Sequence, residues 1–402
     1  MKNKTLCSLN FCWAANYGAI ITAYALNEII KNNNYNVINI NNGDDRQLMI
    51  ENKFKFGRYF LQKYFDRVYK INDKKDLLNL NNLSNIFVVG SDQVFRPNIN
   101  NNIYNDFLLN YVNENSKKIA FSASFGVDKE QFLKENSDQT IKYIKNSLKS
   151  FDFISVREKS GLEICRDLFD IQAEWIIDPV FILNKSKYCE LIKNSSKDFS
   201  GNIVSYLFEK QNHKIYSYLR KKYKKNVVEL WHSNLSIENW LNAIKNCEFL
   251  VTNSYHAMCF AIIFNKPFIA LSKDTGASTR FDSLYEMLDI KDQSVSNIDE
   301  IYERDCIFKI DYNHVNHRIK EERQRGLEFL KNVLAARTKI TQEKIDARIM
   351  YLENTVCELE QQATLKYQIK KELWQLWLII FHKYLPKPMR NIIRAVRDRK
   401  CK

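Results

Sequence analysis

The sequence predicts an α/β protein with two Rossmann-like domains and a helical C-terminal extension. The first observation behind this is that short apolar runs alternate with helical patterns over residues 5–150, as a doubly wound parallel sheet requires. The second is that a similar alternation continues from residue 151 to about residue 325. The third is the length of 402 residues, which suits two domains of ordinary size plus an extension.

The first predicted domain covers residues 1–150. The apolar spacing of residues 18–30 is that of a helix following the first strand. Segment 48–69, rich in aromatic residues and lysine, is predicted to be a helical insert, and the sequence does not identify what it packs against. The predicted strands are residues 6–9, 35–40, 85–89 and 117–122.

The second predicted domain covers residues 151–330 and begins with a strand at residues 153–156. Its other predicted strands are residues 203–208, 227–231, 249–251 and 268–271. Two such domains facing each other across a cleft form a GT-B-like architecture. Residues 331–402 form the predicted extension.

Charge is distributed unevenly along the chain. The formal net charge is +14, and residues 331–402 hold sixteen Lys or Arg and seven Asp or Glu, which gives +9 for the extension and leaves +5 for the rest. The nine cysteines are scattered and never spaced C-x-x-C, which predicts reduced thiols in the cytoplasm rather than disulfides or a zinc site. No signal peptide is apparent, and no apolar run reaches the ~20 residues of a spanning helix.

The strongest candidate for chemistry is His256. It follows an apolar run at residues 249–251 and a Thr-Asn-Ser cluster at residues 252–254, which is typical of a helix N-terminus. His256 is therefore predicted in the first turn of a helix, just past the carboxyl end of a strand. Ligands bind at this edge of open α/β sheets, and helix N-termini favour anions. The alternative is a structural histidine with its hydrogen bonds satisfied.

Seven segments in register resemble the polysaccharide pyruvyl transferase family, and the resemblance covers roughly residues 5–325. The histidine motif is one of them. The remaining segments are Asn16-Tyr17-Gly18-Ala19 with Tyr24-Ala25-Leu26, Val88 to Phe95, Ala123 to Gly126, Ser155 to Gly161, Asp178-Pro179-Val180, and Ser278 to Phe281 with residues 284–290. The resemblance implies a GT-B-like fold and transfer of an enolpyruvyl unit from phosphoenolpyruvate to sugar hydroxyls, usually closing a cyclic ketal.

The chemistry implied by the resemblance assigns roles to several residues. His256 is the expected general acid/base, since its ordinary pKa lies near neutrality. Some relatives carry a basic residue where this chain has Ser254, so Arg157 and Arg280 are the expected cations for the anionic donor. The expected donor side also includes Asn16, Gly18 and Ser254, and the expected acceptor side includes Ser91 and Asp92.

Each of these assignments has a structural alternative. Arg157 could form a surface ion pair with Glu158 or Glu163, Gly18 could simply allow a tight turn, and Asp92 could cap a helix. His314 and His317 have metal-like spacing, but a solvated segment is the preferred interpretation.

No metal and no cofactor are expected, with phosphoenolpyruvate as co-substrate. The absence of G-x-G-x-x-G, P-loop, H-E-x-x-H and D-x-D motifs disfavours a metal-dependent GT-A enzyme. The competing functions are a GT-B glycosyltransferase that uses a nucleotide sugar, and a non-catalytic scaffold of a membrane-bound complex. Nucleic acid is not an expected partner.

The sequence of the extension predicts two contacts, one with a second copy of the chain and one with a membrane. Apolar residues at coiled-coil spacing over residues 345–363 predict self-association. An apolar block at residues 373–381 and a basic, amphipathic end predict that residues 373–402 bind an anionic membrane from the cytoplasmic side. The expected acceptor is then a sugar or oligosaccharide, including a lipid-linked one. The alternative is that residues 373–381 pack on the catalytic body or a second subunit.

Overall fold

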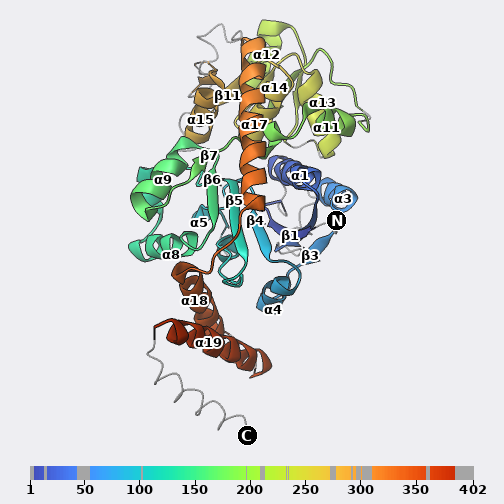
Figure 1. The fold of residues 1–402 in the computed structure, drawn as a ribbon. Helices are drawn as coiled ribbons and strands as arrows, with labels where there is room; N and C mark the ends of the chain where they lie inside the picture. The colour runs from blue at the N-terminus through green and yellow to red at the C-terminus, as the bar shows by residue number, and fades with distance from the viewer. Residues whose placement is uncertain are drawn as a thin grey trace.

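The computed structural model describes most of the chain. The described ranges are residues 4–12, 16–42, 55–100, 103–195, 197–208, 213–231, 233, 235–271, 278–290, 293–295, 300, 310–358 and 363–384. Two stacked α/β domains are crossed by one long helix, and a helical hairpin lies beyond the first domain (Figure 1).

A parallel seven-stranded sheet in the order β3-β2-β1-β4-β5-β6-β7 forms the first domain. All four residues of β4 and all seven of β5 are buried, as expected of strands covered on both faces. The strands are β1 Lys4–Leu9, β2 Tyr35–Asn41, β3 Val68–Lys70, β4 Ile86–Val89, β5 Lys117–Ala123, β6 Phe153–Val156 and β7 Glu174–Trp175. The helices are α1 Tyr17–Asn32, α3 Lys55–Tyr64, α4 Lys74–Asn79, α5 Pro97–Asn100, α6 Tyr104–Phe107, α7 Lys129–Glu135, α8 Asp138–Leu148 and α9 Lys159–Phe169, with a 3-10 turn at Leu80–Asn82.

The second domain contains a five-stranded parallel sheet in the order β12-β11-β10-β8-β9. Its strands are β8 Ile203–Tyr206, β9 Val227–Glu229, β10 Leu250–Thr252, β11 Phe268–Leu271 and β12 Ser294–Val295. Its helices are α10 Pro179–Ile182, α11 Lys185–Ile192, α12 His213–Tyr223, α13 Ile237–Asn246, α14 Tyr255–Ile263 and α15 Ser278–Leu288. Helix α14 is buried along its whole length, which explains why its sequence is apolar on every side.

The boundary between the domains differs from the predicted one. Strand β6, predicted to open the second domain at residue 153, pairs in parallel with β5, and β7 pairs with β6. The first sheet therefore continues to Trp175, because an apolar run indicates a strand but not its neighbours in the sheet. The helical prediction for the insert is confirmed over residues 55–64, which form α3, and wrong at residues 68 and 69, which begin β3; residues 48–54 lie outside the described residues. Helix α3 packs on α1 through Tyr24, whose ring centroid lies 5.5 Å from that of Phe60.

Helix α17, Tyr312–Ala335, joins the two domains (Figure 1). Near its start, the hydroxyl of Tyr312 donates to the carbonyl of Lys266 in the second domain. Near its end, Phe329 packs on Phe121 of β5 with ring centroids 5.9 Å apart. The Lys117 ammonium donates to the carbonyls of residues 333 and 334 at 2.9 Å each, so a cation of the first domain satisfies the end of the helix.

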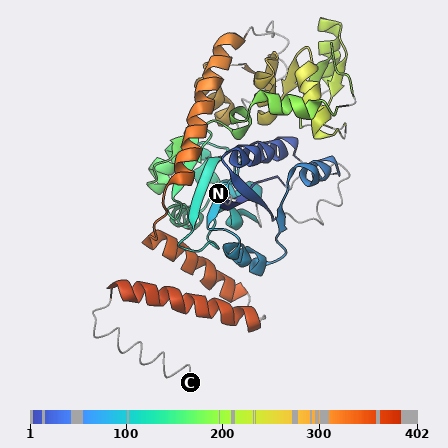
Figure 2. The same cartoon turned by 45° about the vertical axis from the view of Figure 1, so that its right-hand side comes forward.

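The extension forms two helices, α18 Gln342–Glu358 and α19 Ala363–Tyr384, which pack against each other on the first domain (Figure 2). The heptad positions Ile345 and Leu352 are buried in the core of that domain. This part of the stripe predicted to drive self-association is therefore covered by the chain itself; residues 359–362 lie outside the described residues. Among the described helices, none is both long and apolar enough to cross a membrane.

Buried cations connect the extension to the first domain. Lys344 donates to Asp152 at 2.7 Å, and Arg348 donates to Glu372 of α19 at 2.6 Å. Lys118 is fully buried beneath them. Its Nζ donates a hydrogen bond to Ser150 Oγ at 3.2 Å. Burial, followed by the charges of Lys344 and Arg348, lowers the pKa of Lys118 from 10.5 to about 7, although Asp152 and Glu114 partly oppose this.

Lys118→Met is expected to stabilise the protein most at and below neutral pH, with a gain that shrinks as pH rises toward 10. The pKa of Lys118 lies near 7 in the folded chain and near 10.5 when the chain unfolds, so between these values the unfolded state binds more protons. Stability of the wild type should therefore rise with pH over this window by up to about 1.4 kcal/mol per unit from this group. Urea unfolding from pH 6 to 10 measures the difference between the two proteins.

Lys118→Arg serves as the matched control, because a guanidinium keeps its charge throughout this range. It should be less stable than the wild type, with the deficit growing toward high pH. Identical pH profiles for wild type and Lys118→Met would contradict the assignment of the low pKa to this lysine.

Candidate functional site

His256 lies where the sequence predicts, in the first turn of α14 after the central strand β10 of the second sheet. The hydroxyl of Thr252 accepts a hydrogen bond from the backbone N–H of Ser254 at 2.9 Å, and Ser254 Oγ caps the helix by accepting from the N–H of Ala257 at 3.4 Å. These local bonds hold the histidine at the carboxyl end of the strand. Its side chain is almost enclosed, with 5% of the residue exposed.

Three segments outside α14 surround the imidazole ring. Arg157, from the turn after β6, places its Nη1 3.3 Å from Nε2 of His256. Asp178, which caps α10 in the crossover between the domains, places its Oδ2 3.6 Å from the same nitrogen. Gly18 of α1 lies against the Nδ1 edge of the ring, where a Cβ on residue 18 would overlap Nδ1, Cγ and Cβ of His256. The ring is therefore held between the two domains.

A buried ion-pair network lies beside the histidine. Arg157 donates to Asp178 at 2.8 Å and to Asp92 at 3.2 Å, while Ser91 Oγ donates to Asp178 at 3.0 Å. Asp92 adopts a φ of +94°, which is rare for a residue with a side chain and orients its carboxylate from the end of β4.

The network keeps both aspartates ionised. Burial alone would raise the pKa of Asp178, but the hydrogen bond from His256 and the charge of Arg157 outweigh it and lower the pKa far below its ordinary value. For Asp92, burial is outweighed in the same way by the charges of Arg157, His256 and Arg280. The guanidinium of Arg157 is correspondingly held in its charged form, since the carboxylates raise its pKa despite burial.

Tyr255 lies beneath both arginines. The guanidinium carbon of Arg157 is 4.6 Å from the centroid of its ring, and that of Arg280, from α15, is 5.7 Å away. Burial, then the charge of Arg157, lowers the pKa of Arg280 from its ordinary value, partly opposed by nearby carboxylates. The Nε of Arg280 is buried without a hydrogen-bond partner among the described residues. Among the described residues, Arg280 therefore makes fewer hydrogen bonds and ion pairs than Arg157.

Glu158 completes the charged cluster. Its carboxylate accepts hydrogen bonds from the backbone N–H groups of Phe125 at 2.7 Å and Gly126 at 3.0 Å, and lies 3.8 Å from Nε of Arg157. Burial raises its pKa. Three carboxylates thus accompany two arginines around His256.

Nε2 of His256 lies between a donor and an acceptor. Nη1 of Arg157 is 3.3 Å from it, and Oδ2 of Asp178 is 3.6 Å from it. An imidazole nitrogen can accept a hydrogen bond from the first or donate one to the second, depending on the tautomer.

The structure brings most predicted site residues together. His256, Arg157, Arg280, Gly18, Ser254, Ser91 and Asp92 all lie at the domain junction. Asn16 caps α1, its side chain accepting from the N–H groups of Gly18 at 3.0 Å and Ala19 at 3.3 Å. The alternative of an ion pair between Arg157 and Glu158 is confirmed in its partner, at 3.8 Å, but wrong in its surface location, because both side chains are fully buried. No described helix begins at Asp92, so the capping alternative is wrong for that residue.

Asp178 and Tyr255 are site residues that the sequence did not predict, and Glu158 was predicted only as a possible partner of Arg157. Asp178 carried a usable signal, since an Asp-Pro pair follows the apolar Trp175-Ile176-Ile177 run, and proline favours the first position of a helix. Its partners are Ser91, Arg157 and His256, which are 21 to 87 residues away in sequence. Local patterns do not report contacts over such separations.

The histidine pair and the cysteines show no special arrangement among the described residues. His314 and His317 lie on the exposed first turns of α17, where they contact Asp289 at 2.9 Å and Glu321 at 3.3 Å. Within the described ranges, no group of three or more His, Cys, Asp and Glu is placed to hold a metal ion. The seven described cysteines are all free thiols.

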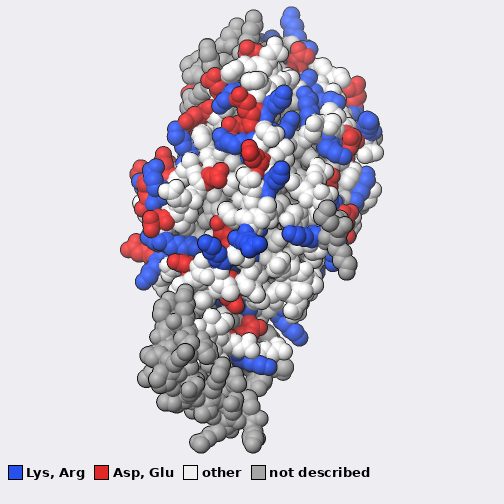
Figure 3. Space-filling view, viewed as in Figure 1, with Lys and Arg blue, Asp and Glu red and all other residues white. Residues whose placement is uncertain are grey.

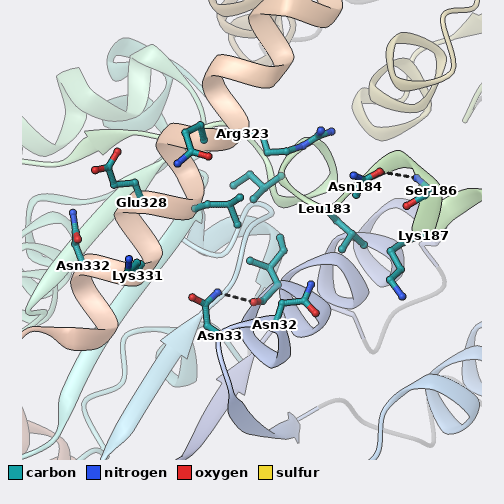
Figure 4. Close-up of a pocket in the computed structure, with 14 residues that line it drawn as sticks. Asn32, Asn33, Leu183, Asn184, Ser186, Lys187, Arg323, Glu328, Lys331 and Asn332 are labelled. Carbon is teal, nitrogen blue, oxygen red and sulfur yellow. Dashed lines mark hydrogen bonds between the residues drawn. The ribbon is translucent and has the colours of Figure 1, made fainter.

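A separate pocket of about 530 Å³ lies between the end of α1, the α10–α11 connection and α17 (Figure 4). Its rim carries amides and Lys187, Arg323, Glu328 and Lys331, and it includes none of the residues around His256. Lys331, Asn332, Asn32 and Asn184 are all exposed on that rim. The pocket therefore has no buried group prepared for chemistry, unlike the cluster at the domain junction.

Two parallel-sheet domains with a buried cluster of charged side chains at their junction define a GT-B-fold protein. The solved structure of UDP-N-acetylglucosamine 2-epimerase from Rickettsia bellii aligns over 83% of this chain and 98% of that one, with a TM-score of 0.51 and 10% identity. The UDP-GlcNAc 2-epimerase from Neisseria meningitidis bound to UDP-GlcNAc aligns over 82% and 100%, with a TM-score of 0.49 and 12% identity.

The sequence model of polysaccharide pyruvyl transferases matches residues 16–275. The chain therefore belongs to the polysaccharide pyruvyl transferase family. No curated protein sequence matches it.

Asp178→Asn is expected to destabilise the protein by about 3 kcal/mol at pH 7, because it leaves the buried Arg157 with one carboxylate fewer. The folded-state pKa of Asp178 is lowered, so its stabilising effect is present above the unfolded-state pKa of about 4 and is lost as pH falls further. Denaturant unfolding measures both effects.

Glu286→Gln is the matched control. Glu286 pairs with Lys159 at 2.6 Å on the surface, where both side chains are about half exposed, and such a pair contributes at most about 1 kcal/mol. Equal losses for the two substitutions would contradict a central role for the Arg157–Asp178 pair.

Proposed function

We propose that this protein transfers an enolpyruvyl unit from phosphoenolpyruvate to hydroxyls of a sugar in a surface polysaccharide or its lipid-linked precursor, closing a pyruvate ketal. The observation that carries the proposal is the position of His256, held between Asp178, Arg157 and Gly18 at the domain junction of a chain from this family.

The proposed reaction consists of two successive additions of sugar hydroxyls to C2 of the donor. An acceptor hydroxyl adds to C2 of the donor, its proton is lost, and the methylene carbon C3 gains a proton to become a methyl group. The C2–O bond to phosphate then breaks, and a second hydroxyl of the sugar adds to C2 while its proton leaves with the phosphate. Each addition needs a group that accepts and returns a proton near neutral pH.

His256 is the group proposed to move these protons. Asp178, whose Oδ2 lies 3.6 Å from Nε2, would stabilise by its charge the imidazolium formed when the ring accepts a proton. Arg157 acts as a positioning residue in this proposal, because its guanidinium already holds Asp178 and Asp92.

Arg280 is the proposed contact for the donor. A donor with a phosphate and a carboxylate enters a cluster in which carboxylates outnumber arginines, so it requires a cation that is not already neutralised. Arg280 has no ion pair among the described residues, and Tyr255 supports its guanidinium from below. The sequence predicts that Arg157 and Arg280 both bind the donor. In the proposal, Arg280 binds the donor and Arg157 positions Asp178 and Asp92.

Incubation with labelled phosphoenolpyruvate and a panel of glycosides and host lipid extract tests the reaction. Wild type should release phosphate and transfer label to an acceptor, and His256→Gln should lower turnover by roughly two to four orders of magnitude while retaining its fold. His314→Gln, at an exposed histidine on α17, is the matched control and should retain wild-type turnover.

Release of a nucleoside diphosphate from a nucleotide sugar, without phosphate from phosphoenolpyruvate, would indicate the competing glycosyltransferase function. A His256→Gln variant with more than about a tenth of the wild-type rate would remove this histidine from the proposed mechanism.

Arg280→Ala and Arg157→Ala are expected to have different kinetic effects. Loss of Arg280 should raise KM for phosphoenolpyruvate by roughly 10- to 100-fold with a smaller change in kcat, since it removes a charge-assisted bond to the donor. Loss of Arg157 should chiefly lower kcat and stability, because Asp92 and Asp178 then remain buried without their cation. A KM effect of Arg280→Ala confined to the acceptor would place this residue on the sugar side.

A further inference from the structure

The outer face of α19 differs from the rest of the described surface. Trp374, Trp377 and Ile379 are 51%, 46% and 41% exposed, whereas Ile369 and Leu376 on the inner face are buried in the first domain's core. The other exposed large apolar residues of the described chain are scattered over separate elements: Tyr59, Val68, Leu83, Leu133, Phe208 and Ile340. Trp374 and Trp377, three positions apart, are neighbours on the surface of α19 and form a patch, which we call the tryptophan face.

The helix that carries the tryptophan face is fixed in place. Helix α18 buries Ile345 and Leu352 in the first domain and pairs Lys344 with Asp152, and its Arg348 binds Glu372 of α19 at 2.6 Å. The tryptophans are therefore presented from a docked helix, so little conformational entropy is lost when that face is covered.

Positive charge accompanies the tryptophan face. Lys370 and Lys371 are exposed one turn before Trp374. The chain then continues for 18 residues beyond α19, with seven Lys or Arg and one acid, Asp398, in residues 385–402. The described face of the body, in contrast, mixes both signs of charge (Figure 3). Exposed tryptophans and lysines thus occur together on α19, and the sequence that follows this helix is basic.

We propose that the tryptophan face binds the surface of an anionic lipid bilayer. Tryptophan rings favour the boundary between lipid head groups and acyl chains, and neighbouring lysines extend toward anionic head groups. Each basic residue near such a surface contributes about 1 kcal/mol. A second copy of the chain is disfavoured as the occupant, because apposed faces would bring two sets of these cations together.

The location of this surface is compatible with the site described above. The α18–α19 hairpin covers the end of the first domain that faces away from the second domain (Figures 1 and 2). Lys117 and Ser116, where β5 begins, contact residues 333–344, while the residues around His256 lie at the carboxyl ends of the strands. Membrane binding through α19 therefore leaves the domain junction uncovered.

The test uses full-length protein and vesicles of phosphatidylcholine with or without phosphatidylglycerol. Truncation near residue 330 is unsuitable, because it removes residues 333–352, which pack in the core and against Lys117. Trp374→Ser combined with Trp377→Ser removes two half-exposed rings, and Leu83→Ser combined with Leu133→Ser is the matched control at exposed apolar residues elsewhere.

Wild type and the leucine control should float with anionic vesicles at low salt, bind weakly at high salt or without phosphatidylglycerol, and show a blue shift of tryptophan fluorescence on binding. The tryptophan double variant should bind at least about tenfold more weakly, and Lys370→Glu with Lys371→Glu should reduce binding to anionic vesicles.

Equal flotation of the wild type and the tryptophan variant would overturn the proposal, as would an absence of wild-type binding. A dimer in sedimentation that dissociates in the tryptophan variant, without vesicle binding, would assign the face to a second copy instead. The assay contains no phosphoenolpyruvate, so its outcome does not depend on the proposed transferase activity.

Discussion

The ion pairs of Arg157 with Asp92 and Asp178 are the interaction on which the site depends. They connect the ends of β4 and β6 with the crossover that leads to the second domain, and all three side chains are removed from water. Burying such charges is costly, and only complementary charges with additional hydrogen bonds offset that cost. The bond from Ser91 and the ring of Tyr255 supply part of this compensation. His256 is positioned against the finished network rather than forming it.

Local sequence predicted the elements better than their partners. The strand–cap–helix pattern around His256 and the helix after Gly18 are confirmed, because capping residues and apolar periodicity are local properties. The sheet to which β6 belongs was wrongly predicted, since pairing depends on chain segments more than 30 residues apart. Arg157 was placed in the correct region, but its buried environment depends on Asp178, whose position follows from the crossover.

In the extension, too, the sequence predicted an element but not the surface that it packs against. The heptad pattern correctly indicated an apolar stripe, yet Ile345 and Leu352 are covered by the first domain of the same chain. Periodicity identifies which side of a helix avoids water but not what covers it. The buried cations at this contact, above all Lys118 beneath Lys344 and Arg348, arise from packing three segments together and have no signature in any one of them.

The contact between Gly18 and His256 joins two halves of the molecule at one imidazole ring. Gly18 belongs to the first domain and His256 to the second, and the Tyr17 hydroxyl donates to the carbonyl of Leu235 at 2.6 Å across the same boundary. Any separation of the domains that admits a substrate withdraws the ring from Gly18 and also from Arg157 and Asp178. The cluster around His256 is therefore complete only when the two domains are together, so the environment of this one ring depends on their relative position.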